Sequence, residues 1–305
     1  MPPPQVHTVF DRALLAQRRR RACMLGPATF LVDRVAEDMA ERLSAVRRAF
    51  EVAVDLGTPT DAVRHALLAA GAIRGIIAAV PIATAAAGEE RVPVIVADEE
   101  CLPFRDASLD LVVSGLALQF VNDLPGALLQ IRRALKPDGL FLAALIGGDT
   151  LGELRQAFAA AEAEVEGGAS PRVAPFADVR TMGALLQRAG FALPVTDVDR
   201  VIVRYDSPVA LMHDLRRMGA SNALAERRRG VLRRMTLARL VEIYAERFAD
   251  PDGRVRATFD VIWLSGWAPH ESQQQPLRPG SARMRLADAL GAREHSAGEK
   301  PERDS

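Results

Sequence analysis

The pattern of apolar and polar residues changes once along the chain, near residue 49. Before that point apolar side chains recur every three or four positions between charged residues, as Val35, Met39 and Leu43 do. This spacing is typical of amphipathic helices and predicts two of them within residues 11–48. After it, the chain carries short apolar runs of the length expected for strands buried on both faces. The runs are VAVDL (52–56), GIIAAV (75–80), VPVIVA (92–97), LDLVV (109–113) and LFLAALI (140–146).

Helix-like stretches separate these runs, and two further strand-like segments follow them. The helix-like stretches cover 61–70, 81–87, 122–135 and 151–166, and the further strands cover 192–204 and 256–267. Strands that alternate with helices form right-handed crossovers, which leave a parallel sheet covered by helices. The sequence therefore predicts an α/β fold with a doubly wound, mostly parallel seven-stranded sheet.

Turns beside the predicted helices carry residues with a local role. Asn122 is expected to cap the helix that follows it, because its side-chain oxygen can accept from a free backbone N–H. The turn at 136–139 ends that helix, with Gly139 expected at positive φ. Asp149 or Thr150 is expected to cap the helix over 151–166.

The chain is predicted to have three regions. They are a helical segment at 1–48, a main domain at 49–290 and a polar tail at 291–305, which is expected to be disordered because it cannot form a core. The main domain contains a helical insertion at about 207–250, before the last strand. Its helices are expected at about 207–218, 222–234 and 236–248. The insertion either forms a lid over a pocket or covers the edge of the sheet, and the sequence leaves both open.

Charge and composition narrow the classes of function. Lys+Arg 39 and Asp+Glu 39 balance to a formal net charge of zero, which argues against nucleic acid as a partner. No run approaches the roughly 18 apolar residues of a membrane span, so no stable membrane insertion is expected. Cys23 and Cys101 lie far apart and show no metal-ligand or redox spacing. Together with a start that lacks a secretory signal, they predict a cytoplasmic protein.

Candidate binding residues follow the predicted strands, because open α/β sheets bind ligands at the carboxyl ends of their strands. Asp55-Leu56-Gly57 is typical of the opening of a nucleotide-binding turn, where glycine lets the backbone approach a ligand. Thr58-Pro59-Thr60 then adds bulk and removes one N–H donor. Asp98, after the third strand, is suited to accept a hydrogen bond from an amine such as that of adenine. An exposed acidic turn also explains Asp98.

Longer stretches resemble a known family. ADEECLPFRDASLDLVVSGLALQFVNDLPGALLQIRRALKPDG (97–139) is similar to the central part of class I S-adenosylmethionine-dependent methyltransferases, whose sheet is Rossmann-like. IGGDTLGELRQAF (146–158), LMHDLRRMGASNAL (211–224) and ATFDVIWLSGWAPHESQQQPLRPGSA (257–282) resemble the mitochondrial complex I assembly factor 5 family, which is associated with arginine hydroxylation. The resemblance runs from Phe10 to Leu286. The malonyl-carrier-protein methyltransferases of biotin synthesis are similar in fold and in parts of the insertion.

This resemblance implies S-adenosylmethionine as the cofactor and places seven residues against it. They are Asp55, Leu56, Gly57, Asp98, Glu99, Ser114 and Leu116. The chain departs from the family at 58–61, where the family's cysteine-glycine-rich continuation is missing, and at Ala79-Val80-Pro81, where the acid that holds the ribose is replaced. Losing that acid costs about 2–4 kcal/mol, or roughly 30- to 1,000-fold in affinity. Cofactor binding is therefore expected to be weak or lost.

Two classes of function follow from the resemblance. The first is an enzyme that modifies a protein client in the assembly of respiratory complex I (NADH:quinone oxidoreductase), by methylation or arginine hydroxylation. The second is a non-catalytic assembly factor with a degenerate cofactor site, and methylation of a malonyl carrier protein is a further alternative. The residues nominate no catalytic group and no set of metal ligands.

Polar residues of the insertion complete the list of candidates. Ser221-Asn222 matches the family and is expected near the mouth of the pocket. His213 and His270 either contribute pocket polarity or lie on the surface. A group of arginines either recognises an acidic protein partner or forms a solvated helix face. These are Arg216, Arg217, Arg227, Arg228, Arg229, Arg233 and Arg234.

Overall fold

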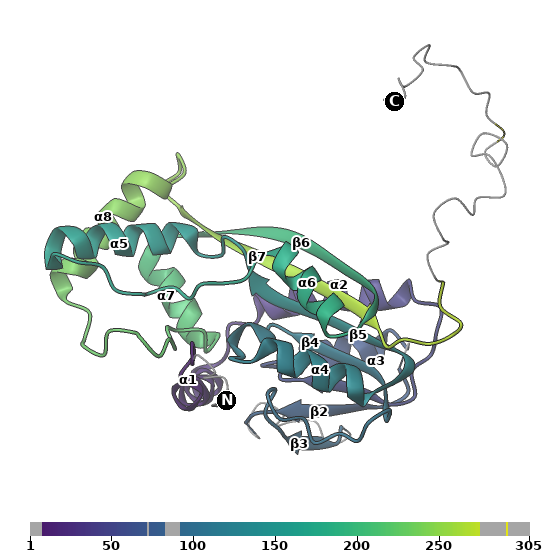
Figure 1. Ribbon diagram of the computed structural model, residues 1–305. Coiled ribbons are helices and arrows are strands. Elements are labelled where there is room, and N and C mark those ends of the chain that lie inside the picture. Colours follow the sequence, from purple (N-terminus) through teal and green to yellow (C-terminus); the bar gives the residue numbers. More distant parts are fainter. Residues whose placement is uncertain (1–7, 72, 83–91, 275–290, 292–305) are drawn as a thin grey trace, which may run out of the picture. The chain divides into compact units, whose positions relative to one another are not determined.

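A seven-stranded sheet with the order β3-β2-β1-β4-β5-β7-β6 forms the centre of the protein in a computed structural model (Figure 1). The structure describes residues 8–71, 73–82, 92–274 and 291. The strands are β1 (Ala53–Leu56), β2 (Ile76–Val80), β3 (Val94–Val96), β4 (Leu109–Gly115), β5 (Leu135–Gly147), β6 (Ala192–Tyr205) and β7 (Val255–Trp267). The helices are α1 (Arg12–Leu25), α2 (Phe30–Ser44), α3 (Ala62–Ala69), α4 (Leu124–Ala134), α5 (Gly152–Glu166), α6 (Val179–Arg188), α7 (Pro208–Arg217) and α8 (Arg234–Phe248), with a short 3-10 helix at Leu118–Phe120.

The first five strands pair in parallel, and β7 runs antiparallel between β5 and β6. Val54 of β1 lies opposite Ile77 of β2 and Val112 of β4. The order reverses on either side of β1, which is the arrangement of a doubly wound sheet. The predicted fold class is therefore confirmed.

Helices cover both faces of the sheet because successive strand residues point to opposite sides. Ala53 and Leu111 pack in the cluster that includes Val35 of α2, whereas Val54 and Val112 pack in the cluster that includes α4 and α6. Figure 1 shows α2 and α3 on one side of the sheet and α4 and α6 on the other. All four residues of β1 are buried, as the continuous apolar run predicts.

The insertion before the last strand contains two helices, α7 and α8, and α8 packs against α5 (Figure 1). The helix predicted at 222–234 is wrong, because residues 221–233 form turns and extended segments. Their backbone is used instead for pairing with the start of the chain. Leu224 bridges to Phe10, and the N–H of Ala225 donates to the carbonyl of Val9 at 2.9 Å.

Two of the predicted helix caps are also wrong. Asp123 caps α4, since its side chain accepts from the N–H of Gly126, and Asn122 binds elsewhere. Leu151, at φ 55°, precedes α5 without a side-chain cap, and the Thr150 hydroxyl donates back to the Gly147 carbonyl at 2.7 Å. Both helices keep the predicted position, because their apolar faces fix it more strongly than their caps do.

The turn before the main part of β5 places its positive φ at Asp138 (62°) and not at Gly139. Glycine is nevertheless needed at position 139, because a Cβ there would lie 2.9 Å from the Lys136 carbonyl oxygen. The helix predicted at 81–87 falls mainly on residues 83–91, which lie outside the described residues, as does the polar tail apart from Gly291.

Candidate functional site

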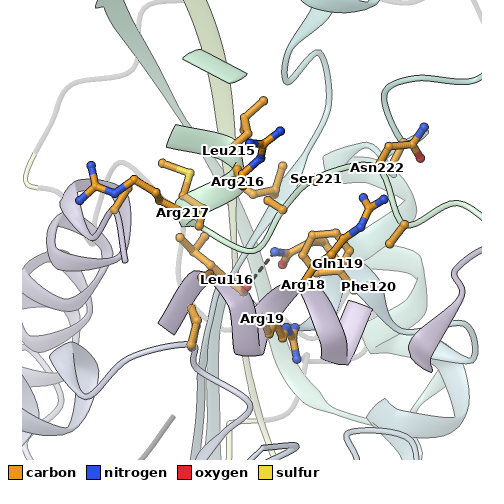
Figure 2. A pocket seen from close by; sticks show the side chains of 18 of the residues that line it. Arg18, Arg19, Leu116, Gln119, Phe120, Leu215, Arg216, Arg217, Ser221 and Asn222 are labelled. Carbon is orange, nitrogen blue, oxygen red and sulfur yellow. Dashed lines mark hydrogen bonds between the residues drawn. The ribbon is translucent and has the colours of Figure 1, made fainter. Parts of the chain in front are cut away.

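A cavity of about 500 Å³ lies at the carboxyl ends of β1, β4 and β5. One wall is made by the turns that follow these strands, including Gly57, Leu116 and Phe120. The opposite wall comes from α1 and from the end of α7, and Ser221 and Asn222 line it as expected (Figure 2). A cavity of this size is in the range of small-molecule sites.

Gly57 brings the backbone to the cavity wall. It has φ 73°, and its N–H donates to the Ala79 carbonyl at 2.7 Å. A Cβ at this position would lie 2.7 Å from Oε1 of Glu99, so no larger residue fits beside that carboxylate. Glu99 is therefore the group that Gly57 approaches, and the approach of this backbone to a ligand stays a prediction.

Asp55 is fully buried, does not line the cavity, and its carboxylate lies in a polar cluster. The Arg64 Nη1 donates to Asp55 Oδ2 at 2.6 Å, and the Thr58 hydroxyl donates to the other oxygen. Thr58 Oγ1 also accepts from the N–H of Gly115 at 2.9 Å. Thr58, which begins the stretch where the chain departs from the family, therefore ties the turn after β1 to the end of β4.

The residues expected after β4 divide between the core and the cavity. Ser114 is buried and donates to the Leu56 carbonyl at 2.7 Å, while Leu116 lines the cavity at φ 53°. Gln119 donates to the Leu116 carbonyl at 2.7 Å. Its Oε1 is buried without a hydrogen-bond partner within the described chain, so it offers an acceptor to a ligand.

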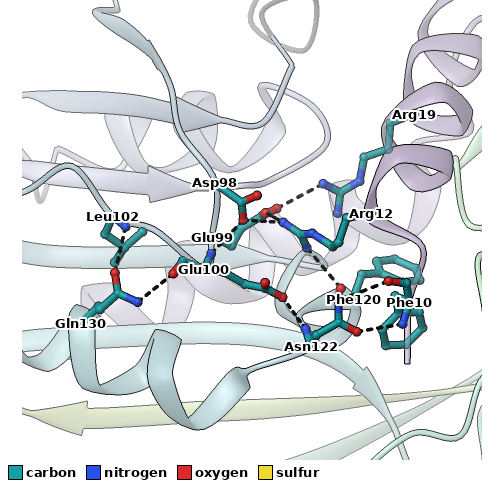
Figure 3. A network of polar contacts seen from close by, with 10 residues as sticks. All are labelled: Phe10, Arg12, Arg19, Asp98, Glu99, Glu100, Leu102, Phe120, Asn122 and Gln130. Atoms are coloured by element: carbon teal, nitrogen blue, oxygen red, sulfur yellow. Dashed lines mark hydrogen bonds and ion pairs between the residues drawn. The ribbon is translucent and has the colours of Figure 1, made fainter. Parts of the chain in front are cut away.

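The acids after β3 bind the N-terminal helix (Figure 3). Glu99 is fully buried and forms ion pairs with Arg12 and, at 3.1 Å, with Arg19. Asp98 Oδ1 accepts from Arg12 at 2.7 Å and from the N–H of Glu100 at 2.9 Å. Burial lowers the pKa of Arg12, but the charges of Glu99 and Asp98 outweigh it and raise that pKa above its ordinary value.

Asn122 links the segment before α1 to the acidic loop after β3. Its Oδ1 accepts from the N–H groups of Val9 and Phe10 at 2.8 Å each, and its own N–H donates to Glu100. The ring of Phe10 packs edge-on against Phe120 at 5.6 Å between centroids. The residue expected to cap α4 therefore holds the segment that leads into α1.

Of the seven residues that the sequence placed against a cofactor, Gly57 and Leu116 line the cavity. Asp55, Leu56 and Ser114 are buried beneath it. Asp98 and Glu99 lie beside it, engaged by α1, so the adenine role of Asp98 stays a prediction. Sequence reasoning missed the arginines of α1. Their signal was the run Arg18 to Arg21, but its partners lie about 80 positions away along the chain.

The position of the cavity, its volume and the backbone turns in its wall suit S-adenosylmethionine. The charge of its lining residues does not. Within the described residues no Asp or Glu lines the cavity, whereas five arginines do. Pro81 stands in the wall where β2 ends, in place of an acid that would accept from ribose hydroxyls. Gly57, Leu116 and Gln119 are the residues that suit the cofactor.

Among the described residues, no three His, Cys, Asp or Glu side chains come together as metal ligands. None of the described helices has the length and apolar character needed to span a lipid bilayer.

Comparison with known proteins places these features in a family. A family model described as a methyltransferase domain matches residues 54–143. The chain is 37% identical over 286 residues to "Arginine-hydroxylase NDUFAF5, mitochondrial" of Danio rerio, which covers 92% of this chain and 89% of that protein. It is 35% identical over 302 residues to the malonyl-[acyl-carrier protein] O-methyltransferase of Laribacter hongkongensis, covering 90% and 93%.

Solved structures support the fold. The YcgJ protein of Bacillus subtilis superposes with a TM-score of 0.52 at 15% identity, over 76% of this chain and 98% of that one. Such a likeness shows the fold alone, because very different functions share this architecture.

The expected location is corrected by the same comparison. The sequence predicted a cytoplasmic protein, but the Danio rerio relative is named as mitochondrial, which points away from the cytoplasm. The prediction rested partly on the two cysteines, and free thiols do not distinguish the cytoplasm from another reducing compartment.

Proposed function

Because the chain belongs to the class I S-adenosylmethionine-dependent methyltransferase family that includes NDUFAF5, we propose that it modifies a protein substrate in the assembly of respiratory complex I. The family's cofactor is S-adenosylmethionine. The turns at Gly57 and Leu116 and the buried acceptor of Gln119 are the groups of this chain that would hold it.

The continuity of the cavity carries this proposal. The wall at the strand ends, with Gly57 and Leu116, belongs to the same cavity as the wall from the insertion, with Met212, Leu215 and Ser221. Group transfer needs donor and acceptor held together in a site that excludes water. A substrate side chain that enters along α7 meets the strand ends, where the family binds its cofactor.

The reaction has two candidate forms. Methyl transfer consumes only the cofactor, whereas hydroxylation of arginine inserts an oxygen atom and needs an oxidant in addition. The two forms leave different masses on the substrate. Mass spectrometry of purified complex I subunits, isolated with and without this protein in the cell, separates a methyl group from an oxygen atom.

Calorimetric titration of the full chain with S-adenosylmethionine and S-adenosylhomocysteine tests the cofactor. Binding in the micromolar range supports an enzyme. No heat at millimolar ligand, with the protein shown to be folded by circular dichroism, would overturn enzymatic use of this cofactor.

A non-catalytic assembly factor is the second candidate, and a specific observation favours it. No acid lines the described cavity, and Asp98 and Glu99 are already bound by Arg12 and Arg19. S-adenosylmethionine carries a net positive charge, which five lining arginines disfavour. If this candidate is correct, the client protein binds equally well with and without S-adenosylmethionine. A pull-down of the client carried out in the presence and in the absence of the cofactor measures this.

A further inference from the structure

The charged side chains that line the cavity are all of one sign. Among the described lining residues are five arginines and no Asp, Glu or Lys. Three of these arginines have partners of their own. Arg19 pairs with Glu99, Arg172 pairs with Glu162, and Arg217 donates to the Gly26 carbonyl at 2.8 Å.

Arg18 and Arg216 differ from these three. Neither side chain has a hydrogen bond or ion pair within the part of the chain that the structure describes, and Arg18 Nη1 is buried. Burial lowers the pKa of Arg18, and repulsion from Arg227 and Arg21 lowers it further, against the weaker attraction of Asp11. Because arginine keeps its proton, Arg18 holds an uncompensated positive charge at the cavity wall.

The two arginines reach the cavity from different elements. Arg18 comes from α1 and Arg216 from the end of α7, and the Ser221 side chain stands between these elements in the same wall (Figure 2). The surrounding wall is apolar, with Leu31, Phe158 and Leu215 among its residues. A small number of polar groups in an otherwise apolar cavity is the usual form of a ligand site.

We propose that Arg18 and Arg216 form a carboxylate-binding subsite that takes an aspartate or glutamate side chain of the protein substrate. A guanidinium fork matches the two oxygens of a carboxylate. A monoanion suits the apolar wall better than a phosphate dianion, because removing a second charge from water costs more. The identity of the ligand as part of a protein rests on the proposed function.

Charge also limits what else can enter this subsite. A lysine or arginine side chain would meet the like charges of the partly buried Arg18 and the exposed Arg216, which repel it. If the modified residue is an arginine, it therefore lies beside this subsite, and a neighbouring acidic residue of the substrate occupies it.

A pair of small probes tests the subsite. N-acetyl-aspartate amide and N-acetyl-asparagine amide have nearly the same shape, and only the first carries a side-chain carboxylate. Ligand-observed NMR on the full chain is expected to show binding of the aspartate probe about tenfold tighter, which corresponds to about 1.4 kcal/mol. Equal affinity for the two probes would contradict the proposal.

Variants test whether Arg18 and Arg216 cause the preference for the aspartate probe. Arg18→Gln and Arg216→Gln are each expected to remove most of the difference between the probes, and Arg18→Lys to retain part of it. Arg20→Gln is the matched control, because Arg20 lies on the same helix, is exposed and does not line the cavity. A preference that survives Arg18→Gln in folded protein overturns the assignment.

The cofactor has a carboxylate too, so a second titration separates the two sources. Decarboxylated S-adenosylmethionine lacks that group. If Arg18→Gln weakens S-adenosylmethionine tenfold and leaves the decarboxylated form unchanged, Arg18 serves the cofactor and the proposal is wrong. If the wild-type protein binds neither cofactor form, the proposed enzymatic function fails, and the aspartate probe still decides the subsite.

Discussion

At the level of single residues, a buried ion pair holds the turn after β1. Asp55 and Arg64 are both fully buried and 2.6 Å apart, and Thr58 bonds to Asp55 and to the N–H of Gly115. The sequence showed only that the family's cysteine-glycine-rich continuation is missing at 58–61. It could not show that Thr58 forms a hydrogen bond to Gly115, because Gly115 lies 57 positions further along the chain.

Breaking this pair is expected to destabilise the fold strongly. Arg64→Ala leaves the Asp55 carboxylate buried without its main counter-charge, which costs about 3–5 kcal/mol in the free energy of unfolding. Urea denaturation measures it. Arg74→Ala is the control, because Arg74 forms an exposed pair with Glu51 and its loss is expected to cost about 0–1 kcal/mol. Similar losses for both variants would show that Asp55 does not depend on Arg64.

Asp260 gives the fold a defined pH response. Arg200 binds both carboxylate oxygens, at 2.7 and 2.8 Å, and the Asp149 N–H donates at 3.0 Å. These contacts, Arg200 first, outweigh burial and lower the pKa of Asp260. A lowered pKa stabilises the fold above the unfolded value of about 3.9, and this contribution is lost as the pH falls through the folded value.

Asp260→Asn is therefore expected to lower the urea midpoint at pH 7 and to differ less from wild type at pH 3. Asp252→Asn is a useful comparison, since the Asp252 side chain is half exposed and pairs directly with the exposed Arg204 at 2.6 Å. Its effect at neutral pH should be much smaller. A gap between Asp260→Asn and wild type that is constant from pH 7 to pH 3 would contradict the role given to Asp260.

At the level of elements, α1 is fastened across the loop after β3. Arg12 and Arg19 lie two turns apart on one face of the helix, and both reach Glu99 (Figure 3). Periodicity predicted the helix itself, because the information is local. It did not predict where the helix docks, since that depends on charges some 80 residues apart. The same limit explains the wrong helix at 222–234, whose backbone pairs with Val9 and Phe10.

Glu99→Gln is expected to loosen α1 without unfolding the sheet. Replacing the charged acceptor removes about 1.5–3 kcal/mol of hydrogen bonding and leaves two arginines without their shared counter-charge. Hydrogen exchange should become faster in residues 12–25 and stay unchanged in β4 and β5. Glu100→Gln is the control, as Glu100 contacts the N–H of Asn122 and not the arginines. Uniformly faster exchange throughout the chain would mean that Glu99 stabilises the whole fold.

At the level of the whole molecule, a net charge of zero conceals an uneven distribution. Many arginines pair with acids on the surface, as Arg34 does with Asp199 and Arg239 with Glu164. Among the described residues that line the cavity there are five arginines and no Asp or Glu. The balanced composition argued against nucleic acid as a partner, which stays a prediction, and it could not reveal a positive cavity, because net charge is a sum over the whole chain. The family motif indicated part of this charge distribution, since it showed that the acid after β2 is missing.

Restoring that acid tests whether the cavity is still a cofactor site. Pro81 lines the wall at the end of β2, so Pro81→Asp places a carboxylate where a ribose would present its hydroxyls and also offsets the arginine charge. Affinity for S-adenosylmethionine is expected to rise about tenfold, which corresponds to ~1.4 kcal/mol. Pro81→Asn has nearly the same shape without the charge and should give a smaller gain. Calorimetry on both variants measures the difference. If neither variant binds S-adenosylmethionine better than wild type does, position 81 does not lie beside a bound nucleoside. The protein is then better explained as an assembly factor that works without the cofactor.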